Sequence, residues 1–327
     1  MRAMVATSYG PPEVLQLREW AKPVPKANEV LVRVRTTTVS AGDSRMRSFT
    51  VPAFVWLPAR LHLGLRRLRN PILGMELAGD VEAVGKDVRR FKAGDRLFAS
   101  TLQHTFGANA EYKCLPENGA LAAMPPNVSY EEAAGLAIGA STALHFLRAA
   151  DVRPGQRVLV NGASGAVGTF AVQIARHYGA HVTGVCSTGN VDLVKSLGAD
   201  EVIDYTREDP AASAATRGAT FDVVFDAVGK TSLSRWLGTL APQGRFLNVG
   251  LPGDALTRRW YAATTGRHVV GGTASPGRED FDHLAELRAA GRLRTVIDRR
   301  YPLEQLVEAH RYVDGGHKRG SVAISVA

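Results

Sequence analysis

A glycine-rich turn between an apolar segment and a helical segment is the strongest chemical signal in the sequence. Residues 157–161 read as a short apolar strand and residues 169–178 as a helix, and glycine stands at positions 162, 165 and 168. Small residues let the backbone approach a pyrophosphate closely, and a helix N-terminus offers it unpaired N–H groups. Because the spacing differs from the commoner Gly-x-Gly-x-x-Gly, the strand before and the helix after decide the interpretation. We expect a dinucleotide phosphate site, with a tight turn that binds no ligand as the alternative.

The end of the next predicted strand, residues 181–186, indicates which dinucleotide is bound. NAD-specific sites carry Asp or Glu there, where the carboxylate holds the ribose hydroxyls. This strand is followed by Ser187, Thr188 and Asn190, without an acid. A carboxylate would repel a 2′-phosphate, whereas two hydroxyls and an amide can hydrogen-bond one. The sequence therefore favours NADPH over NADH, although no arginine lies beside these residues and a helix cap is the alternative role for the two hydroxyls.

The order of strands and helices predicts an α/β chain with two parts. In residues 29–39 valines alternate with polar residues, and further short apolar runs broken by glycine indicate a barrel-like first part. Beyond residue 125 helices and strands alternate, which is typical of a parallel, doubly wound sheet. Its expected strands are residues 157–161, 181–186, 201–203, 221–225, 244–249 and 268–270. The expected helices are residues 129–150, 169–178, 191–197, 280–290 and 303–313. A last strand, residues 321–326, should return to the first part because the sheet already has six strands.

Composition and charge exclude several classes of protein. No segment approaches the ~18 consecutive apolar residues of a membrane span, and two cysteines cannot build a disulfide framework. The net charge is +9, and its densest cluster is Arg60, Arg66, Arg67 and Arg69. We interpret this cluster as a solvated face, with a polyanionic partner as the alternative. We expect a cytoplasmic protein without a membrane partner, and the lack of interleaved aromatic residues disfavours nucleic acid.

Motifs spread along the chain resemble those of the zinc-free quinone oxidoreductases of the medium-chain dehydrogenase/reductase superfamily. They are VNGASGAVGTFAVQIAR at 160–176, GMELAG at 74–79, residues 91–96, SLGAD at 196–200, VIDY at 202–205 and FDAVG at 225–229. The resemblance implies a GroES-like β-barrel catalytic domain, residues 1–124 and 276–327, and a Rossmann domain with a doubly wound parallel sheet, residues 125–275. It also implies a homodimer, for which the edge strand 268–270 is the natural pairing element.

The resemblance assigns site residues as well. Ser40 and Asp43 match positions at the nicotinamide end of the family's cleft, where Ser40 could hydrogen-bond the substrate oxygen and Asp43 is equally well a structural acceptor. Tyr205 matches a tyrosine that reaches the 2′-phosphate, with core packing as the alternative. Lys318 matches a basic position near the cofactor, with a surface charge as the alternative. The complete set of matched cofactor positions is Thr142, Ser164, Gly165, Ala166, Val167, Ser187, Thr188, Asn190, Tyr205, Gly229, Asn248, Gly250 and Lys318.

The three positions that hold catalytic zinc in zinc-dependent members cannot do so in this chain. They fall on Ser40, Met75 and the neighbourhood of Ile138, and zinc requires cysteine, histidine or carboxylate ligands. We therefore expect no metal. Glu76, which follows the histidine position, should instead cap backbone groups.

The implied activity is NADPH-dependent, zinc-independent transfer of hydride to a quinone or a similar electron-poor carbonyl. The cofactor supplies the hydride, and the protein supplies orientation and polarity. An enoyl reductase that acts on α,β-unsaturated carbonyls is the alternative, although the tyrosine that such enzymes often use is absent from residues 46–56. A non-enzymatic NADPH-binding protein is the third possibility, and turnover of any quinone or enone would discriminate it from the other two.

Overall fold

Two compact units make up the computed structural model, which describes residues 1–51, 56–216, 218–229, 233–249 and 262–326. The first unit comprises Met1–Ile138, Gly277–Ala289 and Thr295–Ala327, and the second comprises Gly139–Pro276 and Ala290–Arg294. The division between these two units falls inside helix α3 (Tyr130–Ala149). The reason is that the first turns of α3 are tied to the first unit, where Arg288 pairs with Glu132 at 2.8 Å and the Thr295 hydroxyl donates to the Glu132 carbonyl.

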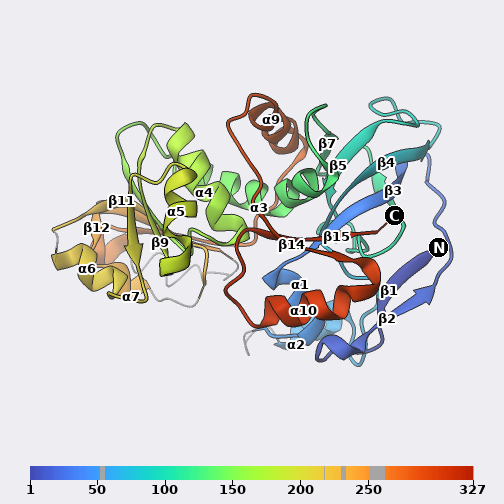
Figure 1. Cartoon of the computed structure of the whole chain (residues 1–327), viewed down its shortest axis with the longest axis horizontal. Coiled ribbons are helices and arrows are strands. Elements are labelled where there is room, and N and C mark those ends of the chain that lie inside the picture. Colours follow the sequence, from blue (N-terminus) through green and yellow to red (C-terminus); the bar gives the residue numbers. More distant parts are fainter. Residues whose placement is uncertain (52–55, 217, 230–232, 250–261, 327) are drawn as a thin grey trace. The chain divides into compact units, whose positions relative to one another are not determined.

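A mixed sheet is the framework of the first unit. Its order is β14-β15-β3-β4-β5-β7, and β6 also pairs with β3. The strands are β3 (Glu29–Val39), β4 (Glu76–Val84), β5 (Arg96–Ser100), β6 (Tyr112–Pro116), β7 (Leu121–Ala123), β14 (Ile297–Pro302) and β15 (Ser321–Ser325). A separate antiparallel pair is formed by β1 (Arg2–Ala6) and β2 (Leu15–Glu19). Figure 1 shows the red strand β15 alongside the blue strand β3, and Val322 lies opposite Val39. The C-terminal segment therefore returns to the first unit, as the sequence predicted.

Buried and exposed side chains alternate along part of β3, and the buried face of the strand contributes to the core of the first unit. Val30, Val32 and Val34 are fully buried while Arg33 is exposed, because successive side chains of a strand point to opposite faces. Helix α10 packs on this core through Leu306, Ala309 and Val313, a helical spacing that gives one apolar stripe. The helices of this unit are η1 (Pro12–Val14), α1 (Ala41–Ser48), α2 (Trp56–Leu63), α9 (Arg278–Ala289), η4 (Leu303–Gln305) and α10 (Leu306–Asp314).

The second unit is a parallel, doubly wound sheet, as predicted. Its order is β10-β9-β8-β11-β12-β13, and every pairing is parallel. The strands are β8 (Arg157–Asn161), β9 (His181–Cys186), β10 (Glu201–Asp204), β11 (Phe221–Asp226), β12 (Leu240–Val249) and β13 (His268–Gly272). The helices are α4 (Ala166–His177), η3 (Thr188–Asn190), α5 (Val191–Ser196), α6 (Pro210–Thr216) and α7 (Leu233–Trp236). In such a sheet ligands bind at the carboxyl ends of the strands, where the order reverses between β8 and β11.

Helix α3 begins with the capping box that the sequence predicted. Glu132 accepts a hydrogen bond from the Ser129 backbone N–H, and the Glu132 N–H donates to the Ser129 hydroxyl at 3.3 Å. The box satisfies N–H groups that a helix start leaves unpaired. No helix in the described part of the chain is both long enough and apolar enough to span a bilayer.

Candidate active site

The turn from β8 to α4 in the second unit has the close backbone packing that a pyrophosphate site needs. Gly162 has φ +80°, which favours glycine. At Gly168 a Cβ atom would lie 2.0 Å from the Gly162 carbonyl oxygen. Only glycine therefore fits at position 168, and its absence of a side chain sets how closely α4 approaches β8.

The start of α4 is open to a ligand. Gly165 is its N-cap and supplies no side-chain hydrogen bond to the first turn. Ser164, Gly165, Ala166 and Val167 are all partly exposed. Since the first N–H groups of a helix lack partners within it, they can bind an anion. The four residues predicted to face the pyrophosphate thus form one continuous surface that fits the group.

Asn190 connects this turn to the end of β9. It is 6% exposed, and its amide donates to the Ser187 hydroxyl at 3.0 Å and the Ser164 hydroxyl at 3.3 Å. Its Oδ1 atom is buried and has no partner among the described residues. The structure therefore brings the predicted pyrophosphate residues and the predicted 2′-phosphate residues together, with Asn190 as the link.

An acid lies beside the predicted 2′-phosphate residues, and sequence reasoning missed it. Asp204, the last residue of β10, pairs in register with Cys186, and its carboxylate accepts a hydrogen bond from the Thr188 hydroxyl at 2.5 Å. Hydrogen bonds from Thr188 and Thr206 lower the pKa of Asp204, which keeps it ionised. The Arg207 Nε atom lies 3.5 Å from this carboxylate. Asp204 follows Thr188 by sixteen positions in the sequence. The acid therefore stands at the end of β10, the strand that pairs with β9, and not at the end of β9, where sequence patterns place it.

The remaining predicted residues of the second unit lie at the carboxyl edge of the sheet or on α3. Tyr205 is 46% exposed, so core packing is wrong for it. The Gly229 N–H donates to Asp226 at 3.3 Å, and Asn248 at the end of β12 has a buried Oδ1 without a partner among the described residues. Thr142 is 8% exposed on α3. Gly250 lies outside the described residues.

A buried amide–carboxylate pair between β8 and β11 was also missed. The Asn161 side chain donates to Asp226 at 2.9 Å, and Asp226 is fully buried. Asp226 also accepts from the Val228 N–H. The pair fixes the ends of two neighbouring strands where their loops begin. Its signal was a polar residue at the end of each of two apolar strands.

In the first unit, Ser40 and Asp43 form the capping box of α1. Asp43 Oδ2 accepts hydrogen bonds from the Ser40 backbone N–H at 2.9 Å and the Ser40 hydroxyl at 2.6 Å. The Asp43 side chain is 2% exposed, and its Oδ1 atom has no partner in the described part of the chain. Asp43 Oδ2 is thus the structural acceptor that the sequence allowed, and the same oxygen is hydrogen-bonded to the Ser40 hydroxyl.

Glu76, the first residue of β4, caps a backbone group as expected. Its Oε2 atom accepts from the Ile138 N–H at 2.6 Å, and its Oε1 atom accepts from the Thr38 hydroxyl. Glu76 is 5% exposed. It therefore ties β3 and β4 to the helix that begins at residue 130.

Lys318 belongs electrostatically to the same group of charges. Its ammonium donates to the Gly320 carbonyl, and it interacts with Glu76, Asp298 and Asp43. Burial raises the pKa of Asp43 to about 6 and that of Glu76 to about 7, while hydrogen bonds from Ser40 and Thr38 partly oppose the rise. Burial lowers the pKa of Lys318 to about 8. We call Asp43, Glu76 and the half-buried Lys318 the buried charge cluster; burial moves the pKa of each of them towards neutrality.

Comparisons with known proteins show the family of the chain. Residues 26–126 match the family described as the alcohol dehydrogenase GroES-like domain, and residues 197–324 match the family described as zinc-binding dehydrogenase. The chain is 34% identical to the quinone oxidoreductase of Sus scrofa, over 98% of this chain and 95% of the relative. It is 32% identical to a chloroplastic quinone-oxidoreductase homolog of Spinacia oleracea, over 99% and 98%. The solved quinone oxidoreductase of Coxiella burnetii matches all of the chain and 99% of its own, with a TM-score of 0.87 at 26% identity.

The chain belongs to the medium-chain dehydrogenase/reductase superfamily, among its quinone oxidoreductase-like members. It is an oxidoreductase with a GroES-like unit and a Rossmann-type unit. A nicotinamide cofactor fits the open start of α4 described above.

The positions of the superfamily's zinc ligands are occupied by side chains of another kind. The Met75 sulfur lies 3.1 Å from the place where a Cβ atom on Gly42 would be, so it packs against the start of α1. Across the described residues no three His, Cys, Asp or Glu side chains gather as metal ligands would. Serine, methionine and isoleucine cannot replace such ligands.

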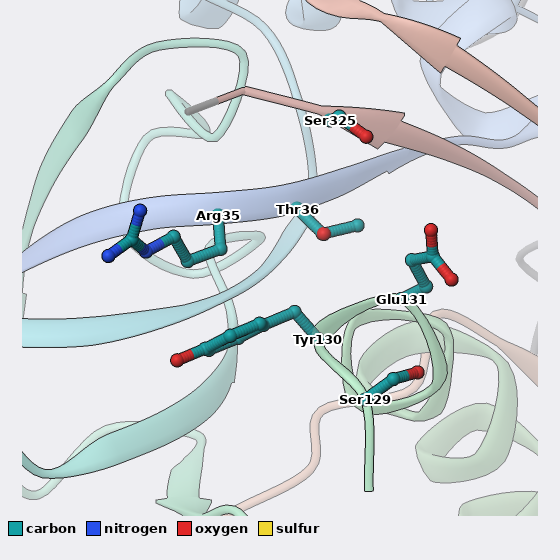
Figure 2. Close-up of a pocket in the computed structure, with 6 residues that line it drawn as sticks. All are labelled: Arg35, Thr36, Ser129, Tyr130, Glu131 and Ser325. Atoms are coloured by element: carbon teal, nitrogen blue, oxygen red, sulfur yellow. The ribbon is translucent and has the colours of Figure 1, made fainter.

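A surface hollow of about 470 Å³ in the first unit lies apart from all the predicted site residues. It is lined by Arg35, Thr36, Ser129, Tyr130, Glu131 and Ser325 (Figure 2). In Figure 2 the Arg35 and Tyr130 side chains extend in the same direction, and both bind Asp80. Glu131 pairs with Arg300 at 3.0 Å. Because these charges already have partners, the hollow is a weaker candidate than the buried charge cluster.

The two glycines of the cofactor turn should separate folding from binding. Gly168→Ala should lower the melting temperature by about 5 °C or more, because the added methyl group collides with the Gly162 carbonyl. At Gly165 the corresponding Cβ atom would lie 3.4 Å from that oxygen and φ is ordinary. Gly165→Ala should therefore melt like the parent protein but bind NADPH about tenfold more weakly, because the backbone approach is blocked. Calorimetric melting and NADPH titration measure both quantities; equal melting of the two variants would contradict the packing argument.

Proposed function

We propose that the protein is an NADPH-dependent, zinc-independent reductase that transfers hydride to a quinone or a similar electron-poor carbonyl. The observation that carries the proposal is the buried charge cluster, which adjoins positions where zinc-dependent relatives hold a metal. Relatives named quinone oxidoreductase support the same substrate class, and relatives named NAD(P)H oxidoreductase support a nicotinamide cofactor. A bound nicotinamide supplies the hydride.

The chain's own residues would supply the proton. In its ionised form Asp43 accepts the Ser40 hydroxyl hydrogen. When Asp43 is protonated, it can instead donate to the Ser40 oxygen, and Ser40 can then donate its own hydrogen to the substrate oxygen. The raised pKa of Asp43, about 6, makes the protonated form accessible. A quinone can also take its second proton from water, so this relay assists the reaction without being indispensable.

The first test is the rate of NADPH oxidation with phenanthrenequinone and with a 2-alkenal, with NADH as the cofactor control. The proposal predicts faster turnover of the quinone with NADPH. Faster turnover of the alkenal would move the assignment to an enoyl reductase, a reaction whose α-carbon must be protonated. Tight NADPH binding without turnover of either compound would favour a non-enzymatic role.

Asp43→Asn tests the relay within the same assay. Because the protonated acid is the active form, the parent rate should rise as pH falls through about 6, and the variant should lose this rise together with about tenfold in kcat. Asp87→Asn, an exposed acid of the same unit, is the matched control. An unchanged pH profile in Asp43→Asn would remove Asp43 from the mechanism.

The preference for NADPH rests on the hydroxyl and amide side chains after β9 and on Arg207, and Asp204 acts against it. Asp204→Asn should raise the ratio of kcat/KM for NADPH over NADH by about three- to tenfold, because a negative charge beside the 2′-phosphate is removed. Glu201→Gln at the other end of β10 is the charge-matched control and should leave the ratio unchanged. A fall in the ratio for Asp204→Asn would contradict the placement of the 2′-phosphate.

We also propose a homodimer that pairs through β13. This strand stands at the end of the sheet order, so its outer edge has no strand partner among the described residues. A cytoplasmic location stays a prediction, and the names of relatives include chloroplastic and mitochondrial proteins.

A further inference from the structure

A short helix of the first unit exposes large apolar side chains that a soluble protein ordinarily buries. Trp56, Leu57, Leu61 and Leu65 are 47%, 56%, 53% and 62% exposed. No residue of helix α2 is fully buried, and among its apolar residues Leu63 is the one that packs against the core of the unit. Leu57 and Leu61 are four positions apart and therefore lie on one face of the helix. A cluster of this kind marks a surface that contacts something else.

The charged residues of the surrounding segment are all positive. Residues 44–75 contain six arginines and no Asp, Glu or Lys. Two of the arginines are used internally: Arg47 pairs with Asp314 at 2.5 Å, and Arg60 stacks on aromatic rings. The other four, Arg45, Arg66, Arg67 and Arg69, are exposed, and none forms an ion pair within the described residues.

Arg60 explains why the apolar side chains face outward. Its guanidinium lies 4.2 Å from the ring centre of Tyr9, 4.1 Å from that of Phe49 and 5.2 Å from that of Trp56. It also donates to the Leu65 carbonyl at 2.8 Å. The arginine therefore holds α2 and the following turn against the unit by the side that carries Trp56, which stays half-exposed, and Leu57 and Leu61 lie on the neighbouring face of the helix.

We propose that this α2 face, made of Trp56, Leu57, Leu61, Leu65, Arg66, Arg67 and Arg69, binds the surface of an anionic lipid bilayer. Leucine and tryptophan side chains enter the boundary between headgroups and acyl chains, and arginines bind the headgroup phosphates. The sequence expectation of no membrane partner rested on the absence of a spanning segment, and a peripheral contact needs none. The proposal concerns attachment and stands independently of the proposed reaction.

Two other occupants fit the face less well. A second copy of the chain in a two-fold contact would place the same patch against itself, and a face with three exposed arginines and no acid would repel its copy. A nucleic acid would use the arginines but not the exposed leucines, since base stacking needs aromatic side chains.

The test is co-sedimentation of the full-length protein with vesicles of phosphatidylcholine alone and with added phosphatidylglycerol. The parent protein should bind only the anionic vesicles, and salt should weaken the binding. Leu57→Gln with Leu61→Gln and, separately, Arg66→Gln with Arg67→Gln should each weaken binding by about tenfold or more. The matched controls are Leu17→Gln, an exposed leucine on β2, and Arg33→Gln with Lys86→Gln, two exposed cations elsewhere in the unit; both should bind like the parent.

A second measurement detects insertion directly. Acyl chains brominated near the headgroup should quench the tryptophan fluorescence of the parent protein, and Trp56→Phe should lose most of the quenching. The proposal is overturned if no vesicle binds, or if the leucine variants bind as well as the parent. It is equally overturned if the leucine variants instead convert a dimer to a monomer in sedimentation, or if an oligonucleotide binds and the anionic vesicle does not.

Discussion

Two carboxyl groups lie buried in the first unit near the half-buried ammonium group of Lys318, and the local structure depends on the hydrogen bonds that satisfy the two carboxyl groups. Removing Asp43 and Glu76 from water is costly unless each finds hydrogen bonds and a counter-charge. Glu76 accepts hydrogen bonds from the Thr38 hydroxyl and the Ile138 N–H, so its carboxylate joins β3, β4 and α3. Asp43 accepts its hydrogen bonds from Ser40 in the capping box of α1. Lys318 supplies the positive charge from the loop before β15, which is the strand that brings the C-terminal segment back to β3.

The organisation of the cofactor turn follows from a different constraint, the distance of closest backbone approach. Gly168 lets α4 pack against the turn, and the uncapped start of the helix then presents N–H groups at the carboxyl edge of the sheet. The side chains around this edge have opposite effects on the binding of a phosphate. Asn190 and Ser187 offer hydrogen bonds that suit a phosphate, whereas Asp204 brings a negative charge that Arg207 offsets only in part. The proposed preference for NADPH therefore depends on a balance of a few charges rather than on one motif.

Much of the fold could be predicted because buried parallel strands are apolar runs bounded by turns. The bounds predicted for β8 and β9 are those observed, and the return of β15 followed from the count of strands. Local sequence patterns could not predict interactions between residues that are far apart in the sequence. Asp204 meets Thr188 only because β10 lies beside β9, and Lys318 interacts with Asp43 and Glu76 across the fold. The division between the two units inside α3 could not be predicted either, since it depends on the ion pair between Arg288 and Glu132.

The central claim of the proposed mechanism is that the carboxyl groups of the buried charge cluster, Asp43 above all, have pKa values raised towards neutrality. Carbon-13 NMR titration of the side-chain carboxyls in the parent protein and in Lys318→Met tests it most directly. The account predicts that Asp43 and Glu76 titrate well above their ordinary values of 3.8 and 4.5, and that both pKa values rise further when the ammonium is removed. Ordinary values in the parent protein, or values that do not respond to Lys318→Met, would contradict it.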